Sequence, residues 1–355
     1  MWHDLEHELT QAEAINAAHI QVMKDDRSTI TVGEGVRDPR GLYGTTQGLL
    51  EEFGPERVVN MPVSESGVMG ICTGAAMLGI RPIVVFQNMD YALLALSQLV
   101  THTVRFSLLN KTLPIVIRIV IGQNWINGPQ SFQTLHGLLA QIVGLKVVMP
   151  VSAKDAKGML IQAFDDPGPV VILEHCWLYS YKGLVPAERY TLPLDKANII
   201  RSGAHITVAA FSFSVLQAVR AANVLTLQGI EIEIIDMRAA RPLDINTVLG
   251  SVRRTGRLIV VDSGVMDNTV AAELITQICE LGFNLLTKAP VRISSTRQPV
   301  PLETSLRDER IVENDSMEIA KASLGLLNRN NKVSYERLAE LLYYDQRLDP
   351  NVIRV

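Results

Sequence analysis

Apolar residues follow two patterns that alternate along the chain. Continuous apolar runs such as RPIVVFQ (81–87) and LPIVIRIVIG (113–122) have the length and the β-branched content of strands buried on both faces. Between such runs, apolar residues recur at helical spacing, as in TQAEAINAAHIQVMKDD (10–26), where the leading Thr can cap a helix. This alternation predicts an α/β fold in which helices cover both faces of a mainly parallel sheet.

The alternation is interrupted once, and it then resumes in a second, smaller unit. The interruption carries two prolines and mixed charge, which is typical of a linker. We therefore expect two open, mainly parallel sheets in separate domains. The expected boundaries are a first domain at 1–185, a linker at 186–203, a second domain at 204–328, and a C-terminal helix and tail at 329–355.

The composition narrows the class of protein. The chain has 355 residues, of which 47% are hydrophobic and 20% charged, as expected for an ordered globular protein. The net charge of −4 is well mixed, which argues against a nucleic-acid partner. Cys72, Cys176 and Cys279 lie far apart in apolar runs, which indicates core residues in a reducing compartment.

The termini and apolar runs give no sign of export or of a membrane segment. The first residues, MWHDLEHELT, carry acids where a signal peptide needs basic residues. No stretch approaches eighteen uninterrupted apolar residues, so no transmembrane helix is expected. We therefore predict a cytoplasmic protein that does not bind membranes.

Common catalytic motifs do not account for this chain. The segment GEGVRDPRG (33–41) follows a predicted strand but matches neither a dinucleotide-binding fingerprint nor a P-loop, so a simple turn is favoured. No GxSxG or HExxH motif occurs. His102 and His136 lie on apolar predicted helices, where a histidine is more often a core or interface residue than a catalyst.

One acidic residue lies between a predicted strand and a helix rich in glycine and alanine. In MPVSESGVMG (61–70) this residue is Glu65. Its small neighbours along the helix would let another backbone approach closely, so we expect this helix to be buried. Glu65 can be read as an acid favoured by the helix dipole, or as a carboxylate that serves catalysis in an apolar wall.

The order of several segments resembles one enzyme family. The resemblance is colinear from about residue 8 to residue 328, and it is to the beta subunit of the thiamine-diphosphate-dependent 2-oxoacid dehydrogenases, the pyruvate and branched-chain enzymes. It implies a transketolase-type pyrimidine-binding domain followed by a transketolase C-terminal-type domain. The segments that carry it are MPVSESGVMG, VVFQNMDYALLALSQLV, GLKVVMPVSAKDAKGML, IIDMRAARPLD and TGRLIVVDSG.

The resemblance assigns roles to four residues at the expected cofactor site. Thiamine diphosphate acts by losing a proton from its thiazolium ring and adding to a 2-oxo carbon. The resemblance implies that Glu65 hydrogen-bonds the pyrimidine ring and helps to activate it. It also implies that Val63 packs near the pyrimidine, that Gln87 lies beside it, and that Tyr91 stacks on the ring.

The family needs a second site that this chain lacks. Its Mg²⁺ is held by a GDG…N motif, and no GDG occurs here. The resemblance therefore implies an alpha-type subunit that carries this motif and holds the Mg²⁺, in a heterotetramer. It further implies self-association through the C-terminal domain and a lipoyl acyltransferase core as a partner. Asp166 matches a position near a monovalent-cation site, which suggests K⁺.

The chain departs from the family at positions that would line the substrate pocket. Ser131 occupies the place of a family histidine that assists acyl transfer to the lipoyl group, and Gln141 replaces a second histidine. His136 lies five residues after Ser131 and is a weaker candidate for the same pocket. Gly35 replaces an aspartate in the usual Gly-Glu-Asp-Val. Since serine cannot change charge near pH 7 as imidazole does, acyl transfer is expected to differ.

Three functions remain open. The first is the beta-type subunit of a 2-oxoacid dehydrogenase, which overall similarity favours. The second is half of a split transketolase or of an acyloin-forming ligase that transfers a two-carbon or acyl unit to an aldehyde, which Ser131 favours. The third is a catalytically silent partner subunit, which the joint presence of Glu65, Gln87 and Tyr91 disfavours.

Overall fold

The computed structural model describes residues 6–110, 112–122, 134–295 and 314–329, together with 338 and 340–342. Contacts divide the chain into two compact units that meet in the sequence between Leu194 and Asp195. That point falls inside the range expected to link two domains. The two units are described separately below.

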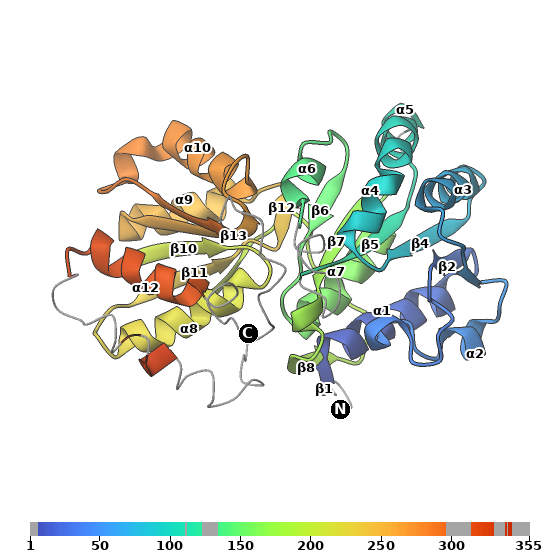
Figure 1. Cartoon of the computed structure of the whole chain (residues 1–355), viewed down its shortest axis with the longest axis horizontal. Coiled ribbons are helices and arrows are strands. Elements are labelled where there is room, and N and C mark those ends of the chain that lie inside the picture. The colour runs from blue at the N-terminus through green and yellow to red at the C-terminus, as the bar shows by residue number, and fades with distance from the viewer. Residues whose placement is uncertain are drawn as a thin grey trace, which may run out of the picture. The chain divides into compact units, whose positions relative to one another are not determined.

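The first unit is built on a parallel sheet, as the apolar runs predicted. Its strands lie in the order β6-β7-β5-β4-β2-β3, and every neighbouring pair is parallel (Figure 1). Parallel strands buried on both faces account for the near-continuous apolar runs. The strand bounds are β2 (Thr29–Gly33), β3 (Val58–Asn60), β4 (Arg81–Phe86), β5 (Val116–Ile121), β6 (Lys146–Val148) and β7 (Val170–His175).

Helices cover both faces of this sheet. Alternate residues of β5 face opposite helices, because Arg118 contacts His19 of α1 whereas Ile117 and Ile119 face α4. Helix α1 packs on α7, and α3 packs on α4. The bounds are α1 (Gln11–Asp25), α2 (Leu49–Phe53), α3 (Glu65–Met77), α4 (Met89–Gln98), α5 (Val104–Asn110), α6 (His136–Ala140) and α7 (Ala153–Asp165). The 3₁₀ helices are η1 (Leu42–Gly44) and η4 (Cys176–Leu178), and the π-helical segment η2 (Leu99–Thr103) lies between α4 and α5.

Local signals set the ends of two predicted helices. Thr10 caps α1 through a capping box with Glu13, in which each side chain bonds the other residue's backbone N–H. Gly54 ends α2 with φ +78°, a conformation that glycine adopts without strain. The boundary at Thr10 confirms the cap that the sequence predicts.

Helix α3 is not buried as a whole, so that expectation was wrong for the chain by itself. One stripe, which includes Val68, Met69 and Cys72, packs inward. The opposite stripe exposes Ile71 and Gly74. The apolar content of the helix is therefore divided between the core and an exposed face.

One helical stretch bears on the expectation that the chain has no membrane segment. The continuous helical stretch Met89–Leu109 is long and apolar enough to cross a membrane, by length and composition alone, and no other helix among the described residues is. The sequence criterion missed it because polar residues interrupt the apolar run. A single stretch of this kind is weak evidence of a membrane helix.

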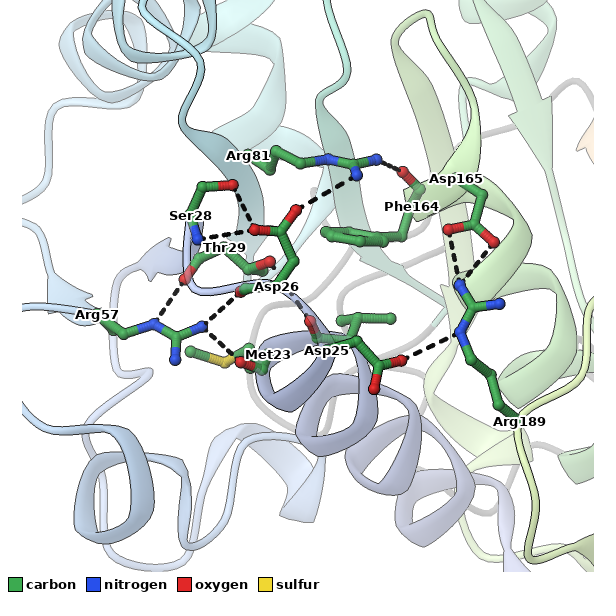
Figure 2. A network of polar contacts seen from close by, with 11 residues as sticks. Met23, Asp25, Asp26, Ser28, Thr29, Arg57, Arg81, Phe164, Asp165 and Arg189 are labelled. Atoms are coloured by element: carbon green, nitrogen blue, oxygen red, sulfur yellow. Dashed lines mark hydrogen bonds and ion pairs between the residues drawn. The ribbon is translucent and has the colours of Figure 1, made fainter.

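Arginine side chains link the C-terminal end of α1 to neighbouring segments of the first unit (Figure 2). The Arg57 guanidinium donates to three backbone carbonyls, those of Met23, Asp26 and Thr29, at 2.7 to 3.0 Å. Arg81 contacts the Asp26 carboxylate and packs over the Phe164 ring. The bond to Met23 satisfies a carbonyl in the last turn of α1, which the helix itself leaves without a partner, and the bond to Thr29 reaches β2.

A two-stranded antiparallel ribbon was not predicted. It pairs β1 (Glu6–Thr10) with β8 (Lys182–Pro186), which lie far apart in the sequence. Both strands carry charged residues and lack an apolar run, so periodicity could not identify them.

The second unit contains a smaller, mainly parallel sheet with the strand order β14-β13-β10-β11-β9. Only β9, which runs antiparallel to β11, departs from the parallel arrangement of these strands. Helix α12 packs on α8. The bounds are β9 (Asn198–Arg201), β10 (Ile206–Ala210), α8 (Ser214–Thr226), β11 (Ile232–Asp236), β12 (Ala239–Arg241), α9 (Ile245–Thr255), β13 (Leu258–Val265), α10 (Val270–Gly282), η5 (Phe283–Leu285), β14 (Val291–Ser295) and α12 (Asn314–Leu326).

The predicted C-terminal helix at 329–355 lies largely outside the described residues. Leu338 and residues 340–342 are helical. The other described residue of that range, Arg329, follows the end of α12.

Candidate active site

A pocket opens where β2 and β4 end and where α3 and α4 begin. The space at this pocket, counted together with open solvent at its mouth, is about 290 Å³. Four residues proposed from the sequence, namely Val63, Glu65, Gln87 and Tyr91, come together in its wall. The other lining residues are Gly33, Glu34, Pro62, Val68, Val85 and Phe86. In parallel α/β sheets, the carboxyl ends of the strands are the usual place for a ligand.

Glu65 is the first residue of α3, and it lines the pocket among largely apolar residues. The residue is only 7% exposed. Its Oε1 atom is buried and has no hydrogen-bond partner in the structure. A buried polar atom without a partner costs about 1–3 kcal/mol. The fold therefore keeps a carboxylate oxygen at this place that a ligand can satisfy.

Gln87 and the residues at the end of β2 also line this pocket. The Gln87 Nε2 atom donates to the backbone carbonyl of Glu34 at 3.2 Å. Gly33 is needed where β2 passes β4, because a Cβ at that position would lie 2.4 Å from the Val85 carbonyl oxygen. The glycine thus lets the two strands approach closely and brings Glu34 beside Gln87.

Two apolar groups at the pocket remain partly open. Tyr91 lies in the first turn of α4, where the Asn88 side chain accepts the Tyr91 backbone N–H at 3.1 Å. Tyr91 is 39% exposed and Val63 is 69% exposed. An exposed aromatic ring and an exposed valine beside a buried carboxylate form one side of a site for a flat heterocycle.

The candidates for the substrate pocket are not placed with this group. Ser131 lies outside the described residues. His136 is buried at the start of α6, and its Nδ1 atom is 2.8 Å from the Thr134 hydroxyl. It does not line the pocket that holds Glu65. Gln141 lines a separate apolar groove beside α4 and α5.

Asp166 follows α7, and its carboxylate already has partners. It contacts the Lys146 ammonium and accepts the Gly168 backbone N–H at 3.0 Å. Lys146 therefore supplies a positive charge where a monovalent cation was expected, and the K⁺ assignment stays a prediction. Among the residues that the structure describes, no group of three His, Cys, Asp or Glu side chains could hold a metal ion.

Buried charges on the α1 side of the sheet were not identified from the sequence. Arg118 on β5 forms a bidentate ion pair with Glu174 on β7, at 2.5 and 2.6 Å. Tyr179 donates to the same carboxylate at 2.7 Å, and the His19 Nε2 atom lies 3.0 Å from Arg118. Burial, together with the Arg118 charge, holds the pKa of His19 well below its usual value. The cluster joins α1, β5 and β7 away from the pocket.

Sequence reasoning also missed Glu34 and Phe86 as pocket residues. Both stand at or just after the end of a predicted strand. Their shared position at the carboxyl ends of neighbouring parallel strands is the signal that could have identified them.

Comparisons with known proteins agree with this geometry. Residues 7–180 match the family model "Transketolase, pyrimidine binding domain", and residues 195–317 match "Transketolase, C-terminal domain". The pyruvate dehydrogenase E1 component subunit beta of Rhizobium meliloti (strain 1021) is 37% identical over 302 residues, which are 84% of this chain and 66% of that protein. The mitochondrial pyruvate dehydrogenase E1 component subunit beta of Pisum sativum is 36% identical, over 91% of each chain.

Two further relatives extend the comparison. The acetoin:2,6-dichlorophenolindophenol oxidoreductase subunit beta of Bacillus subtilis (strain 168) is 34% identical over 90% of this chain and 97% of that one. A solved structure titled split gene transketolase, inactive beta4 tetramer, has a TM-score of 0.72, with 16% identity over 91% of this chain and 99% of that chain, and supports the fold alone. The chain therefore belongs to the transketolase-type family of beta subunits represented by that of the pyruvate dehydrogenase E1 component.

Proposed function

We propose that this chain is the beta-type subunit of a thiamine-diphosphate-dependent 2-oxoacid dehydrogenase. The observation that carries the proposal is Glu65, whose buried Oε1 atom lacks a partner in a wall shared with Gln87 and Tyr91. A silent structural subunit has no use for this costly arrangement.

The residues of the pocket fit the aminopyrimidine half of the cofactor. Glu65 offers a carboxylate that can share a proton with a ring nitrogen, and Tyr91 offers an aromatic face. When bound, thiamine diphosphate supplies the carbon nucleophile that adds to a 2-oxo carbon. This chain's own contribution is to orient the pyrimidine, to hold a proton at Glu65 and to exclude water with Val63 and Phe86.

The diphosphate end of the cofactor calls for a second chain. The absence of a GDG motif from the sequence supports an alpha-type partner that holds Mg²⁺. Exposed apolar residues on α3, α4 and α5 support the same conclusion, because α3 and α4 also carry pocket residues. These exposed residues include Ile71, Leu94, Leu108 and Leu109. A groove continues this surface between α5 and α6, and its space, counted with open solvent as for the pocket that holds Glu65, is about 850 Å³.

The acyl acceptor is a separate question. Ser131 and Gln141 in place of two family histidines support an acceptor other than a lipoyl group, such as an aldehyde. Product analysis of the assembled enzyme with a 2-oxoacid, with and without an added aldehyde, distinguishes a dehydrogenase from a split transketolase or acyloin-forming ligase. Two partner assignments stay predictions, namely a lipoyl acyltransferase and self-association through the second unit. The cytoplasmic location also stays a prediction, since the plant relative named above is mitochondrial.

The role of Glu65 is tested by a conservative substitution with a matched control. Glu65→Gln keeps the shape of the side chain but removes the charge that can share a proton. In the complex with the alpha-type partner, we expect this variant to lose at least about a hundredfold in 2-oxoacid decarboxylation, the lower range for general acid–base groups. Glu273→Gln makes the same change in the first turn of α10, a helix that also has 13 residues, and should leave the rate unchanged. Full activity of Glu65→Gln would refute the assignment.

A further inference from the structure

The lack of a side chain at Gly35, beside Gln87, distinguishes this pocket from the pattern expected of the family. Gly35, which stands where the resemblance gives an aspartate, has φ +73°. A Cβ at this position would lie 2.9 Å from the Gln87 Nε2 atom, and no other atom would come within 4 Å. A side chain at position 35 would therefore displace the Gln87 amide, and its backbone would be strained as well.

The contacts of Gly35 hold the turn in place. The Gly35 backbone N–H donates to the Asn60 side-chain oxygen at 2.8 Å, and the Gly35 carbonyl accepts from the Asp38 backbone N–H at 3.1 Å. These two bonds tie the turn after β2 to the residue that ends β3 and to the chain that follows. The turn cannot easily move aside to accommodate a side chain.

The Glu34 carbonyl sets which end of the Gln87 amide faces it. Only the nitrogen end can face the Glu34 carbonyl, because an amide oxygen there would bring two acceptors together at 3.2 Å. The oxygen end is then the part of Gln87 that can accept a hydrogen bond from a ligand. Since Glu65 lines the same pocket, its wall offers a carboxylate and a neutral acceptor.

We propose that Gly35 is a positioning residue, which sets Gln87 to accept a hydrogen bond from an amino group on the ring bound in this pocket. This inference rests on the proposed function, in which that ring is the aminopyrimidine of thiamine diphosphate. It predicts that the pocket binds a ring with an amino group more tightly than the same ring in which oxygen replaces that amino group.

The preference is measured as a ratio of two affinities. Calorimetric titration of the complex with its alpha-type partner, in Mg²⁺, gives dissociation constants for thiamine diphosphate and for oxythiamine diphosphate, in which oxygen replaces the amino group. Loss of one neutral hydrogen bond corresponds to about a threefold to tenfold change. We therefore expect Gly35→Ala to reduce the preference for the amino compound by about that factor.

Three variants separate positioning from backbone strain. Gly48→Ala is the matched control, because Gly48 has φ +75° and open space around its missing Cβ; it should leave the ratio unchanged. Gln87→Met, which removes both ends of the amide, should reduce the ratio as Gly35→Ala does. Gly35→Ala in a Gln87→Met background should then have no further effect, and Gln87→Met alone tests the proposal if Gly35→Ala does not fold.

The outcomes distinguish this inference from the function on which it rests. If the unmodified complex binds neither compound, the proposed function is wrong, and the inference fails with it. If thiamine diphosphate binds but all the variants keep the same ratio, only the roles of Gly35 and Gln87 are refuted. A ratio that falls equally in Gly48→Ala would show backbone strain and would also refute the positioning role.

Discussion

Glu65 shows how a single residue can cost stability and prepare a site. A helix N-terminus favours a negative charge, but the buried Oε1 atom receives no hydrogen bond in the structure. Folded proteins rarely leave such atoms without partners, and exceptions often mark functional sites. The unsatisfied oxygen is what distinguishes Glu65 from a helix-capping acid, and only the structure reveals it.

His175 leads to a prediction about acid stability. Burial at the end of β7 lowers the pKa of His175 from 6.5 to about 3, and its Nδ1 atom accepts the Trp177 backbone N–H at 3.3 Å. Since the unfolded chain binds the proton more readily, the folded state loses stability as the pH falls from 6.5 towards 3, by about 1.4 kcal/mol per pH unit for this group. His175→Asn should make the decline shallower by that slope.

The measurement for His175 is denaturant unfolding between pH 6.5 and pH 4.5. His102→Asn, on an exposed part of η2, is the control. Equal slopes for the unmodified protein and His175→Asn would contradict the buried neutral state of His175.

At this scale, the sequence could identify side chains but not their contacts. Val63, Glu65, Gln87 and Tyr91 were proposed from the resemblance to a family, and they line one pocket. The approach of Gly35 to Gln87 joins the ends of two strands about fifty residues apart, so no local pattern could reveal it. The bidentate pair of Arg118 and Glu174 depends in the same way on the order of strands in the sheet.

Among the elements, Arg57 joins the end of α1 to the start of β2 (Figure 2). Its planar guanidinium bonds three carbonyls at once, which a lysine ammonium on a flexible chain cannot reproduce in that geometry. Arg57→Lys should lower the free energy of unfolding by about 1–3 kcal/mol and leave ligand binding in the pocket unchanged.

Denaturant unfolding checks the prediction for Arg57, and the same region offers a control. Arg189 pairs with Asp165 and Asp25 near the surface. Such exposed pairs contribute about 0–1 kcal/mol, so Arg189→Lys should have the smaller effect. An effect of Arg57→Lys no larger than that of Arg189→Lys would show that the carbonyl bonds contribute little.

The helices and strands that could be predicted from the sequence are those with a clear pattern of apolar residues. Buried parallel strands and capped helices were predicted because continuous runs and helical spacing mark them. The ribbon of β1 and β8 was missed, because polar strands that pair across most of a domain carry no such mark. The burial of α3 was overestimated, because one exposed face of the helix is itself apolar.

In the whole molecule, the exposed apolar surface of α3, α4 and α5 supports an assembly. A charge on this surface would be buried without a partner if a second chain covers it, which is strongly unfavourable. Leu94→Glu, at a residue that is 60% exposed, should therefore weaken association with the alpha-type partner at least about tenfold. The chain alone should stay folded.

Leu184→Glu is the matched control for this surface. Leu184 is 59% exposed and lies on β8, away from the three helices. Sedimentation of mixtures with the alpha-type partner measures both variants. If Leu94→Glu binds the alpha-type partner as tightly as the unmodified chain does, this surface is not the interface with that partner.

The central claim is that this chain forms half of a cofactor site, and one measurement tests it most directly. Thiamine diphosphate with Mg²⁺ is titrated calorimetrically into the chain alone and into its complex with the alpha-type partner. The account predicts binding to the complex with at least about a hundredfold higher affinity than to the chain alone, because the chain lacks the diphosphate site. Equal binding to both would contradict the half-site, and no binding to either would leave the silent partner subunit as the better explanation.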